Sequence, residues 1–168
     1  RLPCPPAIYA HNAGIGVKTR AIWREVIDLL ARLDGMDFRQ TSVVRPGAPF
    51  LFPWGAEWRA SEEILSRPLP GIAPTMIARA GGLDQGNLGL NLADAEERGL
   101  GASVLFLAGS AINSIRNAEG KYDTALGAEA MQQAIDVHRS GALRDVPASE
   151  YLRALCAVAS RRGLRALR

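Results

Sequence analysis

The chain has 168 residues, of which 48% are hydrophobic and 22% charged, and its formal net charge is +3. This is the composition of a folded globular domain, and it excludes an intrinsically disordered chain. The longest uncharged apolar run, Leu100 to Ile112, is shorter than the roughly 20 residues that a membrane-spanning helix needs, and Gly and Ser interrupt it. We therefore expect one apolar core and no membrane segment.

The start of the chain and its cysteines bear on the cellular location of the protein. The stretch "RLPCPPAIYAHNAG" lacks the apolar core of a signal peptide and begins without Met. Cys4 and Cys156 show no metal-binding or CxxC spacing, which favours reduced thiols in the cytoplasm. Because a strand-like run starts almost at once, we expect the chain to be part of a longer protein. The basic end "SRRGLRALR" suits a helix C-terminus, so no nucleic-acid partner is predicted.

Strand-like and helix-like segments alternate along the chain, judged by apolar periodicity. In chain order we predict a strand at 5–11, a helix at 19–35, a strand at 36–44, a short helix around Arg59–Leu65, a strand at 73–80, a helix at 91–99, a strand at 103–109, and helices at 122–141 and 149–164. The first helix is the clearest, because one of its faces is apolar, with Ile22, Val26, Leu29, Leu30 and Leu33. On the helix at 122–141, His138 lies in an apolar stripe and is interpreted as structural.

This alternation predicts a parallel sheet covered by helices. Two architectures fit it, a doubly wound open sheet and half of a (β/α)8 barrel, and both place function at the carboxyl ends of the strands. The long connection at 45–58 contains Trp54 and Trp58. They are interpreted either as a lid over a substrate or as a surface packed against a partner subunit.

Candidate functional residues follow the four predicted strands. Glycines directly after a strand leave backbone N–H groups open to an anion, and an imidazole carries protons near neutral pH. The candidates in strand order are His11 and Asn12, then Arg39 and Arg45, then Gly81 and Gly82, then Ala108, Gly109 and Ser110. Taken alone, the glycine pair can equally be a tight turn. The sequence has no GxGxxG, Walker loop, GxSxG or HExxH motif.

Five segments carry a family resemblance. The segments "IYAHNAG", "RLDGMDFRQTSVVRPG", "GIAPTMIARAGGL", "VLFLAGSAIN" and "NAEGKYDTALGAEAMQQAIDVHRSG" stand in this order along the chain. They resemble the fifth to eighth strands, and the helix after the eighth, of the large-subunit barrel of ribulose bisphosphate carboxylase (RuBisCO), specifically of the RuBisCO-like proteins of form IV type. The resemblance covers roughly residues 5–142. It implies the C-terminal half of a (β/α)8 TIM barrel over 1–145 and a C-terminal helical extension over 146–168.

The sequence departs from the family at positions that matter for carboxylation. The sixth loop, 43–47, has no Lys to hold CO2, and Asn12 replaces the Arg that follows the fifth-strand His. The sixth-strand His pair is replaced within 38–40, and Ala80 stands where the family has Ser before the glycines. The resemblance therefore implies an enzyme that does not fix CO2 but enolises, isomerises or decarboxylates a phosphorylated ketose or keto acid, as a lyase or isomerase.

The resemblance also implies roles for the candidates. The glycine loops would hold one phosphate, Arg39 or Arg45 would contribute charge at the other end of the substrate, and His11 would contact the substrate or carry a proton. The family binds Mg²⁺ through a carbamylated Lys, an Asp and a Glu on the second strand, so these ligands are expected upstream of this chain. Expected partners are a phosphorylated small molecule, a missing N-terminal half or second subunit, and a second copy of the full protein in a homodimer.

Two other functions fit the same sequence. One is a self-contained α/β module that binds a phosphorylated metabolite without catalysis. The other is a non-catalytic assembly subunit that uses Trp54, Trp58 and the basic C-terminal end as its contact surface.

Overall fold

The computed structural model describes residues 6–11, 22–44, 57–147 and 150–161. Along these residues the elements are β1 (Tyr9–Ala10), α2 (Arg24–Leu33), β2 (Phe38–Thr41), α3 (Glu57–Ser66), β3 (Met76–Arg79), α4 (Leu88–Glu97), the 3-10 helix η1 (Gly101–Ser103), β4 (Val104–Phe106), α5 (Gly109–Asn113), α6 (Thr124–Arg139) and α7 (Tyr151–Arg161). Every predicted strand and helix overlaps an observed one, but α4 begins three residues before the predicted helix at 91–99, and α3 extends beyond the predicted helix at Arg59–Leu65 at both ends. The helices η1 and α5 were not predicted. No described helix is long and apolar enough to cross a membrane.

The four strands form one sheet in the order β1-β2-β3-β4, and every neighbouring pair is parallel. The register pairs Thr41 with Arg79 and Arg79 with Phe106, so the carboxyl ends of β2, β3 and β4 lie side by side. Neighbours in sequence order are also neighbours in the sheet, which is the strand order of a (β/α)8 barrel. The predicted parallel α/β architecture is confirmed.

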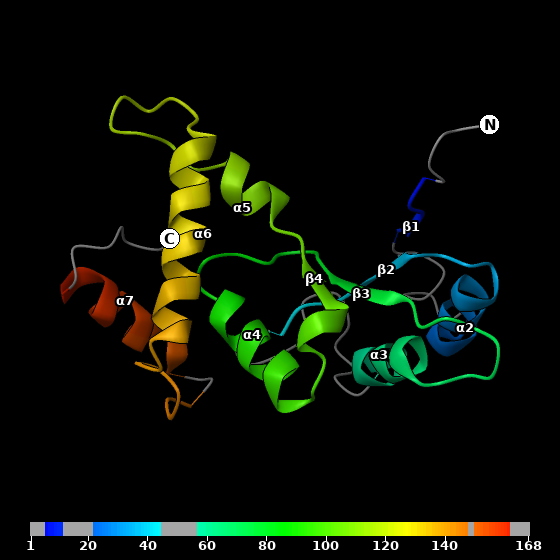
Figure 1. The fold of residues 1–168 in the computed structure, drawn as a ribbon. Coiled ribbons are helices and arrows are strands. Elements are labelled where there is room, and N and C mark those ends of the chain that lie inside the picture. The colour runs from blue at the N-terminus through cyan, green and yellow to red at the C-terminus, as the bar shows by residue number, and fades with distance from the viewer. Residues whose placement is uncertain (1–5, 12–21, 45–56, 148–149, 162–168) are drawn as a thin grey trace.

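Helices cover one face of the sheet (Figure 1). Ile77 of β3 packs there with Leu65 of α3 and Ala95 of α4, and all three side chains are buried. A second cluster joins Val43, after β2, to Leu83 and Leu88 and to Met131 and Ala134 of α6. Because side chains alternate along a strand, residues next to Ile77 point to the other face.

The other face of the sheet is exposed at its amino end. Tyr9, Met76 and Leu105 belong to this face, and between 36% and 39% of each residue is exposed. In a closed barrel, this face lies in the interior and is filled by side chains from all the strands. The exposed apolar side chains therefore fit a barrel of which this chain supplies four of the strands.

The first helix packs with its polar face inward. Arg24, Asp28 and Arg32 are buried against α3 and the sheet, where Arg32 donates hydrogen bonds to the carbonyl oxygens of Ile64 and Arg67. The apolar face that identifies this helix in the sequence lies opposite and is exposed. Its exposed side chains are Ile22, Trp23, Val26, Leu29, Leu30 and Leu33. A face of this kind normally packs against another element.

The helix after β4 is held close to α6. Asp123 caps the N-terminus of α6, where its carboxylate accepts a hydrogen bond from the Leu126 amide. Gly127, one turn further along, lies so close to α5 that a Cβ at this position would be 2.2 Å from the Ile112 carbonyl oxygen. Only glycine permits this approach of the two helices. The packing places the N-terminus of α5 at the carboxyl end of the sheet.

Candidate functional site

The two glycine-bearing loops leave neighbouring strands and are joined by hydrogen bonds. The Leu107 amide, just after β4, donates to the carbonyl oxygen of Arg79, the last residue of β3, at 3.0 Å. Further out, the Gln85 side-chain amide donates to the Ala111 carbonyl oxygen in α5 at 3.2 Å. The structure therefore brings the loop containing Gly81 and Gly82 next to the loop containing Ala108 to Ser110.

The first loop needs glycine at two successive positions. Gly81 and Gly82 have φ of 88° and 99°, a backbone region that side chains strongly disfavour. Asn87 braces the loop, because its side-chain amide donates to the Gly82 carbonyl oxygen at 2.9 Å. Its side-chain oxygen accepts from the Asp84 amide at 3.1 Å. The glycines are thus part of a rigid turn, and consecutive amides in such turns form concave anion-binding surfaces.

The second loop leads into a short helix. Ala108 is the N-cap of α5, and no side-chain hydrogen bond caps the helix there. Gly109 and Ser110, its first residues, are both exposed. The amides of a first helical turn have no partner within the helix. Because α5 starts beside the glycine turn, amides from both loops can serve one anion.

The residues predicted at the first strand are only partly described. His11 follows β1 and is exposed, and its ring lies edge-on to the Tyr9 ring with centroids 6.1 Å apart. Its position at the open carboxyl end of the sheet suits contact with a substrate. Asn12 and Arg45 lie outside the described residues.

The sequence-based role of Arg39 in substrate binding is not favoured by its position. Its side chain is 2% exposed and its Nε donates to the Asp28 carboxylate at 2.7 Å, within the layer between α2 and the sheet. Asp28 also accepts a hydrogen bond from Ser61. Burial raises the pKa of Asp28, and the charges of Arg24 and Arg39 oppose that rise. The Arg39 guanidinium thus already serves a buried ion pair, and the phosphate site proposed below is built without it.

Ser42 is a candidate that sequence reasoning missed. It is fully buried, and its hydroxyl has no hydrogen-bond partner among the described residues. The residues on either side of it face the helices, since Thr41 donates to Glu62 and Val43 packs in the core. Ser42 therefore faces the side on which a barrel interior would lie. A lone serine after a strand carries no pattern that could have identified it in the sequence.

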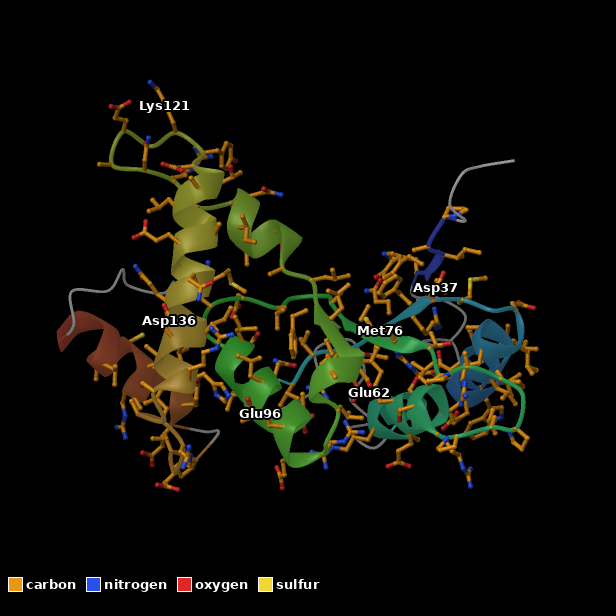
Figure 2. All side chains as sticks on the ribbon, in the orientation of Figure 1. Asp37, Glu62, Met76, Glu96, Lys121 and Asp136 are labelled. Atoms are coloured by element: carbon orange, nitrogen blue, oxygen red, sulfur yellow. The ribbon has the colours of Figure 1, made fainter. Side chains whose placement is uncertain are left out.

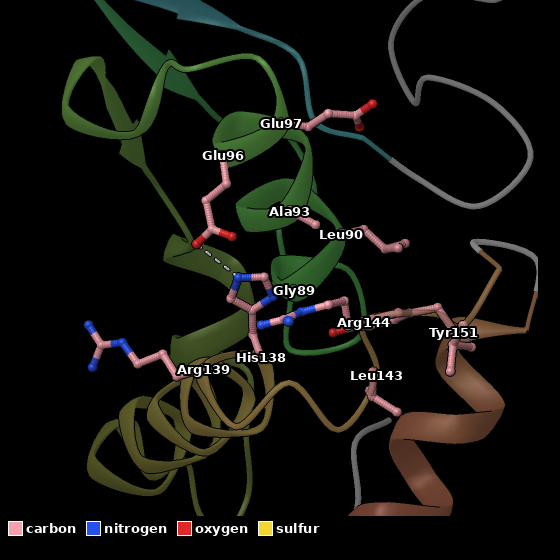
Figure 3. Close-up of a pocket in the computed structure, with 11 residues that line it drawn as sticks. Gly89, Leu90, Ala93, Glu96, Glu97, His138, Arg139, Leu143, Arg144 and Tyr151 are labelled. Atoms are coloured by element: carbon pink, nitrogen blue, oxygen red, sulfur yellow. Dashed lines mark hydrogen bonds and ion pairs between the residues drawn. The ribbon is translucent and has the colours of Figure 1, made fainter.

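Two cavities of the described structure lie away from these loops. The larger, of about 540 Å³, lies among α4, the end of α6 and the start of α7, with His138 in its wall (Figure 3). The smaller, of about 460 Å³, lies near the amino ends of β2 and β3. Neither contains a glycine-loop residue. No group of three or more His, Cys, Asp or Glu that could hold a metal occurs in the described part of the chain.

Comparisons with known proteins give a structural match. No family model matches the chain, and no curated protein matches its sequence. Among solved structures, octameric ribulose-1,5-bisphosphate carboxylase/oxygenase (RuBisCO) of Pyrococcus horikoshii OT3 in complex with sulfate matches with a TM-score of 0.62 and 22% identity over 92% of this chain. A second crystal form of the octameric enzyme matches with a TM-score of 0.59 and 21% identity over 93% of this chain.

The match covers only part of each RuBisCO chain. This chain spans 35% and 36% of the two RuBisCO chains. The match covers 92% of this chain, so the four-stranded parallel sheet and its helices lie within the matched part. The chain therefore has a RuBisCO-like fold, that of the C-terminal part of the RuBisCO barrel.

Proposed function

We propose that this chain is the phosphate-binding part of a RuBisCO-like enzyme, of form IV type, that acts on a phosphorylated ketose or keto acid. The observation that carries the proposal is the pair of glycine-bearing loops joined through the Leu107 amide and the Arg79 carbonyl at 3.0 Å. Phosphate sites in barrel enzymes are frequently built from two such consecutive loops and a short extra helix. One of the matching RuBisCO structures is a complex with sulfate, a tetrahedral anion like phosphate.

The proposed site binds through backbone amides and hydroxyls. The turn at Gly81 and Gly82 and the start of α5 at Gly109 and Ser110 would supply the amides. The Ser42 hydroxyl, which is buried at the end of the adjacent strand without a partner among the described residues, would add a donor from the side of the barrel interior.

The proposed chemistry is formation of an enolate next to a carbonyl group of the substrate, followed by isomerisation or decarboxylation. His11 is exposed at the end of β1 and would act as the proton carrier. The loop at 43–47 contains no Lys, so CO2 fixation is not proposed. A Mg²⁺ ion would stabilise the enolate in this class of chemistry. Its ligands would come from the part of the RuBisCO chain that this chain does not span. We also propose that the full protein is cytoplasmic and forms a dimer.

The missing partner would be the other half of the barrel, in the same polypeptide or in a second one. Two exposed apolar surfaces support this proposal. The first is the barrel-interior face at Tyr9, Met76 and Leu105, and the second is the outward face of α2 around Val26 and Leu30. In a barrel, α3 flanks α2 on one side and the helix of the preceding unit flanks it on the other. The apolar face of α2 points away from the side that packs on α3, where that preceding helix would lie.

Binding of glycerol 3-phosphate, measured by isothermal titration calorimetry, tests the proposed function. Gly82→Asp places a carboxylate beside the phosphate at a position with φ of 99° and should abolish binding. Gly99→Asp is the matched control, since Gly99 also has a positive φ, of 66°, but lies at the end of α4, before β4. The control should bind as the unaltered chain does. Equal loss in both variants, or no binding by the unaltered chain with and without Mg²⁺, contradicts the proposal.

The Ser42 hydroxyl can be tested by moving it to the next strand. Ser42 and Ala80 lie side by side on neighbouring strands, because each directly follows one of the paired residues Thr41 and Arg79. Ser42→Ala should weaken binding at least about tenfold, because hydrogen bonds to charged groups contribute roughly 1.5–3 kcal/mol. Adding Ala80→Ser to this variant should restore part of the affinity. Unchanged affinity in Ser42→Ala would remove Ser42 from the site and leave the glycine loops in it.

A further inference from the structure

We propose that the cavity formed by α4, the C-terminal end of α6 and the segment leading into α7 binds a small organic carboxylate with an apolar body. This cavity has a volume of about 540 Å³, and a benzoate-sized molecule fits within it. It lies on the helix-covered side of the sheet and contains none of the glycine-loop residues. The proposal is therefore independent of the phosphate site and adds a second ligand site to the chain.

The cavity has an apolar wall and a polar wall. Leu90 and Ala93 of α4, with Leu143 and Val146 from the connection to α7, give the apolar wall. His138 and Arg144 belong to the polar wall (Figure 3). Ligand sites with mostly apolar linings and a few convergent polar groups fix the orientation of their ligand through those groups. An apolar body would lie against the leucines and a polar head would face the polar wall.

The charges of the polar wall favour an anionic head. Glu96 Oε1 lies 3.0 Å from His138 Nε2, so this carboxylate already has a partner. In Figure 3, the Arg144 side chain lies beside His138, whereas Glu97 and Arg139 point away from it. No carboxylate pairs with the Arg144 guanidinium in the part of the chain that the structure describes. A carboxylate head would accept two parallel hydrogen bonds from this guanidinium, which is the geometry that the planar arginine group favours.

Tyr151 supplies a second, independent observation. Tyr151 is 4% exposed, and its hydroxyl is buried without a hydrogen-bond partner among the described residues. The hydroxyl lies against Gly89 of α4, where a Cβ would be 1.7 Å from it, so no side chain separates the two. Gly89 and Tyr151 both line the cavity. Burial of an unpaired hydroxyl is unfavourable, and a shift of the Tyr151 ring into the cavity would let a ligand oxygen accept a hydrogen bond from it.

The carboxylate class follows from the combination of these groups. The Arg144 guanidinium, which has no carboxylate partner among the described residues, matches a head with a single negative charge, and the nearby Glu96 carboxylate disfavours a doubly charged phosphate. At position 89 the Tyr151 hydroxyl occupies the space that a Cβ would take, so any larger residue there would displace the ring that lines the cavity. The leucine wall requires an apolar body, which inorganic anions lack. A small aromatic or branched aliphatic carboxylate satisfies both conditions, a singly charged head and an apolar body.

The test is a titration of the ¹⁵N-labelled full chain with benzoate, followed through amide shifts of α4 and α6. We expect saturable shifts at Gly89, Leu90 and Ala93, and none with the neutral isostere benzamide. Arg144→Gln should weaken binding at least about tenfold, and Tyr151→Phe by a smaller factor. Arg153→Gln, which alters an exposed arginine paired with Glu150 on the outside of α7, is the matched control and should bind normally.

Each outcome of this test decides the proposal. Tyr151→Phe removes a hydroxyl that has no partner, so its spectrum reports directly whether the fold is kept. Equal binding of benzoate and benzamide would show an apolar site without the proposed carboxylate specificity and overturn the inference. Unaltered affinity in Arg144→Gln, or the absence of saturable shifts in the unaltered chain, would overturn it as well.

Discussion

Arg79 of β3 and Glu62 of α3 are joined by two parallel hydrogen bonds, from Nε to Oε1 and from Nη2 to Oε2, each 2.9 Å long. Both side chains are fully buried. Arg79 also binds the Asp94 carboxylate of α4, and Glu62 accepts from Arg98. Figure 2 shows Glu62 in the layer between α3 and the strands. The strand that leads into the glycine turn is thus fixed to two helices by buried charges.

Removing the charge of Glu62 should strongly destabilise the fold. Glu62→Gln leaves Arg79 in the interior without its bidentate partner, and breaking a buried pair costs about 3–5 kcal/mol. The free energy of unfolding, measured by urea denaturation, should fall by this amount. The neighbouring Glu63 is exposed, so Glu63→Gln should change it by less than about 0.5 kcal/mol. Similar values for the two variants would contradict the buried network.

The contact between α5 and α6 should tolerate no residue larger than glycine at position 127. Gly127→Ala places a methyl group 2.2 Å from the Ile112 carbonyl oxygen, and overpacking of this kind costs about 1–3 kcal/mol. The same substitution should weaken glycerol 3-phosphate binding, because it displaces the helix that begins at Gly109. Gly101→Ala is the control, since no atom lies within 4 Å of the added methyl. If the two variants melt alike, the contact between the helices is not as described.

Burial of Tyr151 predicts that the stability of the fold depends on pH in the alkaline range. Burial raises the pKa of Tyr151 above its ordinary value of 10.0. The unfolded chain therefore loses this proton near pH 10 while the folded chain keeps it, so stability should fall as the pH rises above 10. Tyr151→Phe removes this contribution and should become progressively more stable than the unaltered chain between pH 9.5 and pH 11. A difference between the two that does not change across this range would show that the hydroxyl titrates normally.

The inverted packing of α2 predicts opposite effects for two neighbouring residues. Leu30 is 51% exposed on the apolar face, whereas Ala31 is 7% exposed on the buried face. Leu30→Lys should change the free energy of unfolding by less than about 0.5 kcal/mol and should reduce self-association of the chain in sedimentation velocity. Ala31→Lys should unfold the helix from α3. A severe loss of stability in Leu30→Lys would show that the apolar face is the packed one.

The alternation of strands and helices could be predicted from the sequence because it depends on local patterns. Apolar runs such as the one around Leu105 and the helical period of α6 are set by neighbouring residues, and the structure confirms both. The glycine turn could also be predicted, since Gly81 and Gly82 stand directly after a strand and take the positive φ that this position requires. Both observations concern residues close together in the chain.

The features that could not be predicted depend on residues far apart in the sequence. The orientation of α2 is decided by bonds from Arg24 to Ser61 and from Arg32 to the Ile64 carbonyl, more than 30 residues away. Burial of Arg39 likewise depends on Asp28 across the sheet-helix layer. That the Ser42 hydroxyl lacks a partner among the described residues follows from the fold, so the sequence alone does not show it. Periodicity finds the apolar face of a helix but not the side on which its partner lies.

The central claim is that the glycine loops after β3 and β4 hold one phosphate group. A titration of the ¹⁵N-labelled chain with glycerol 3-phosphate tests it most directly, with glycerol as the reference ligand. We predict saturable shifts of the Gly81, Gly82, Gly109 and Ser110 amides that share a single dissociation constant, and no such shifts with glycerol. Saturable shifts confined to other parts of the chain, or unchanged loop amides at saturating ligand, would contradict the account.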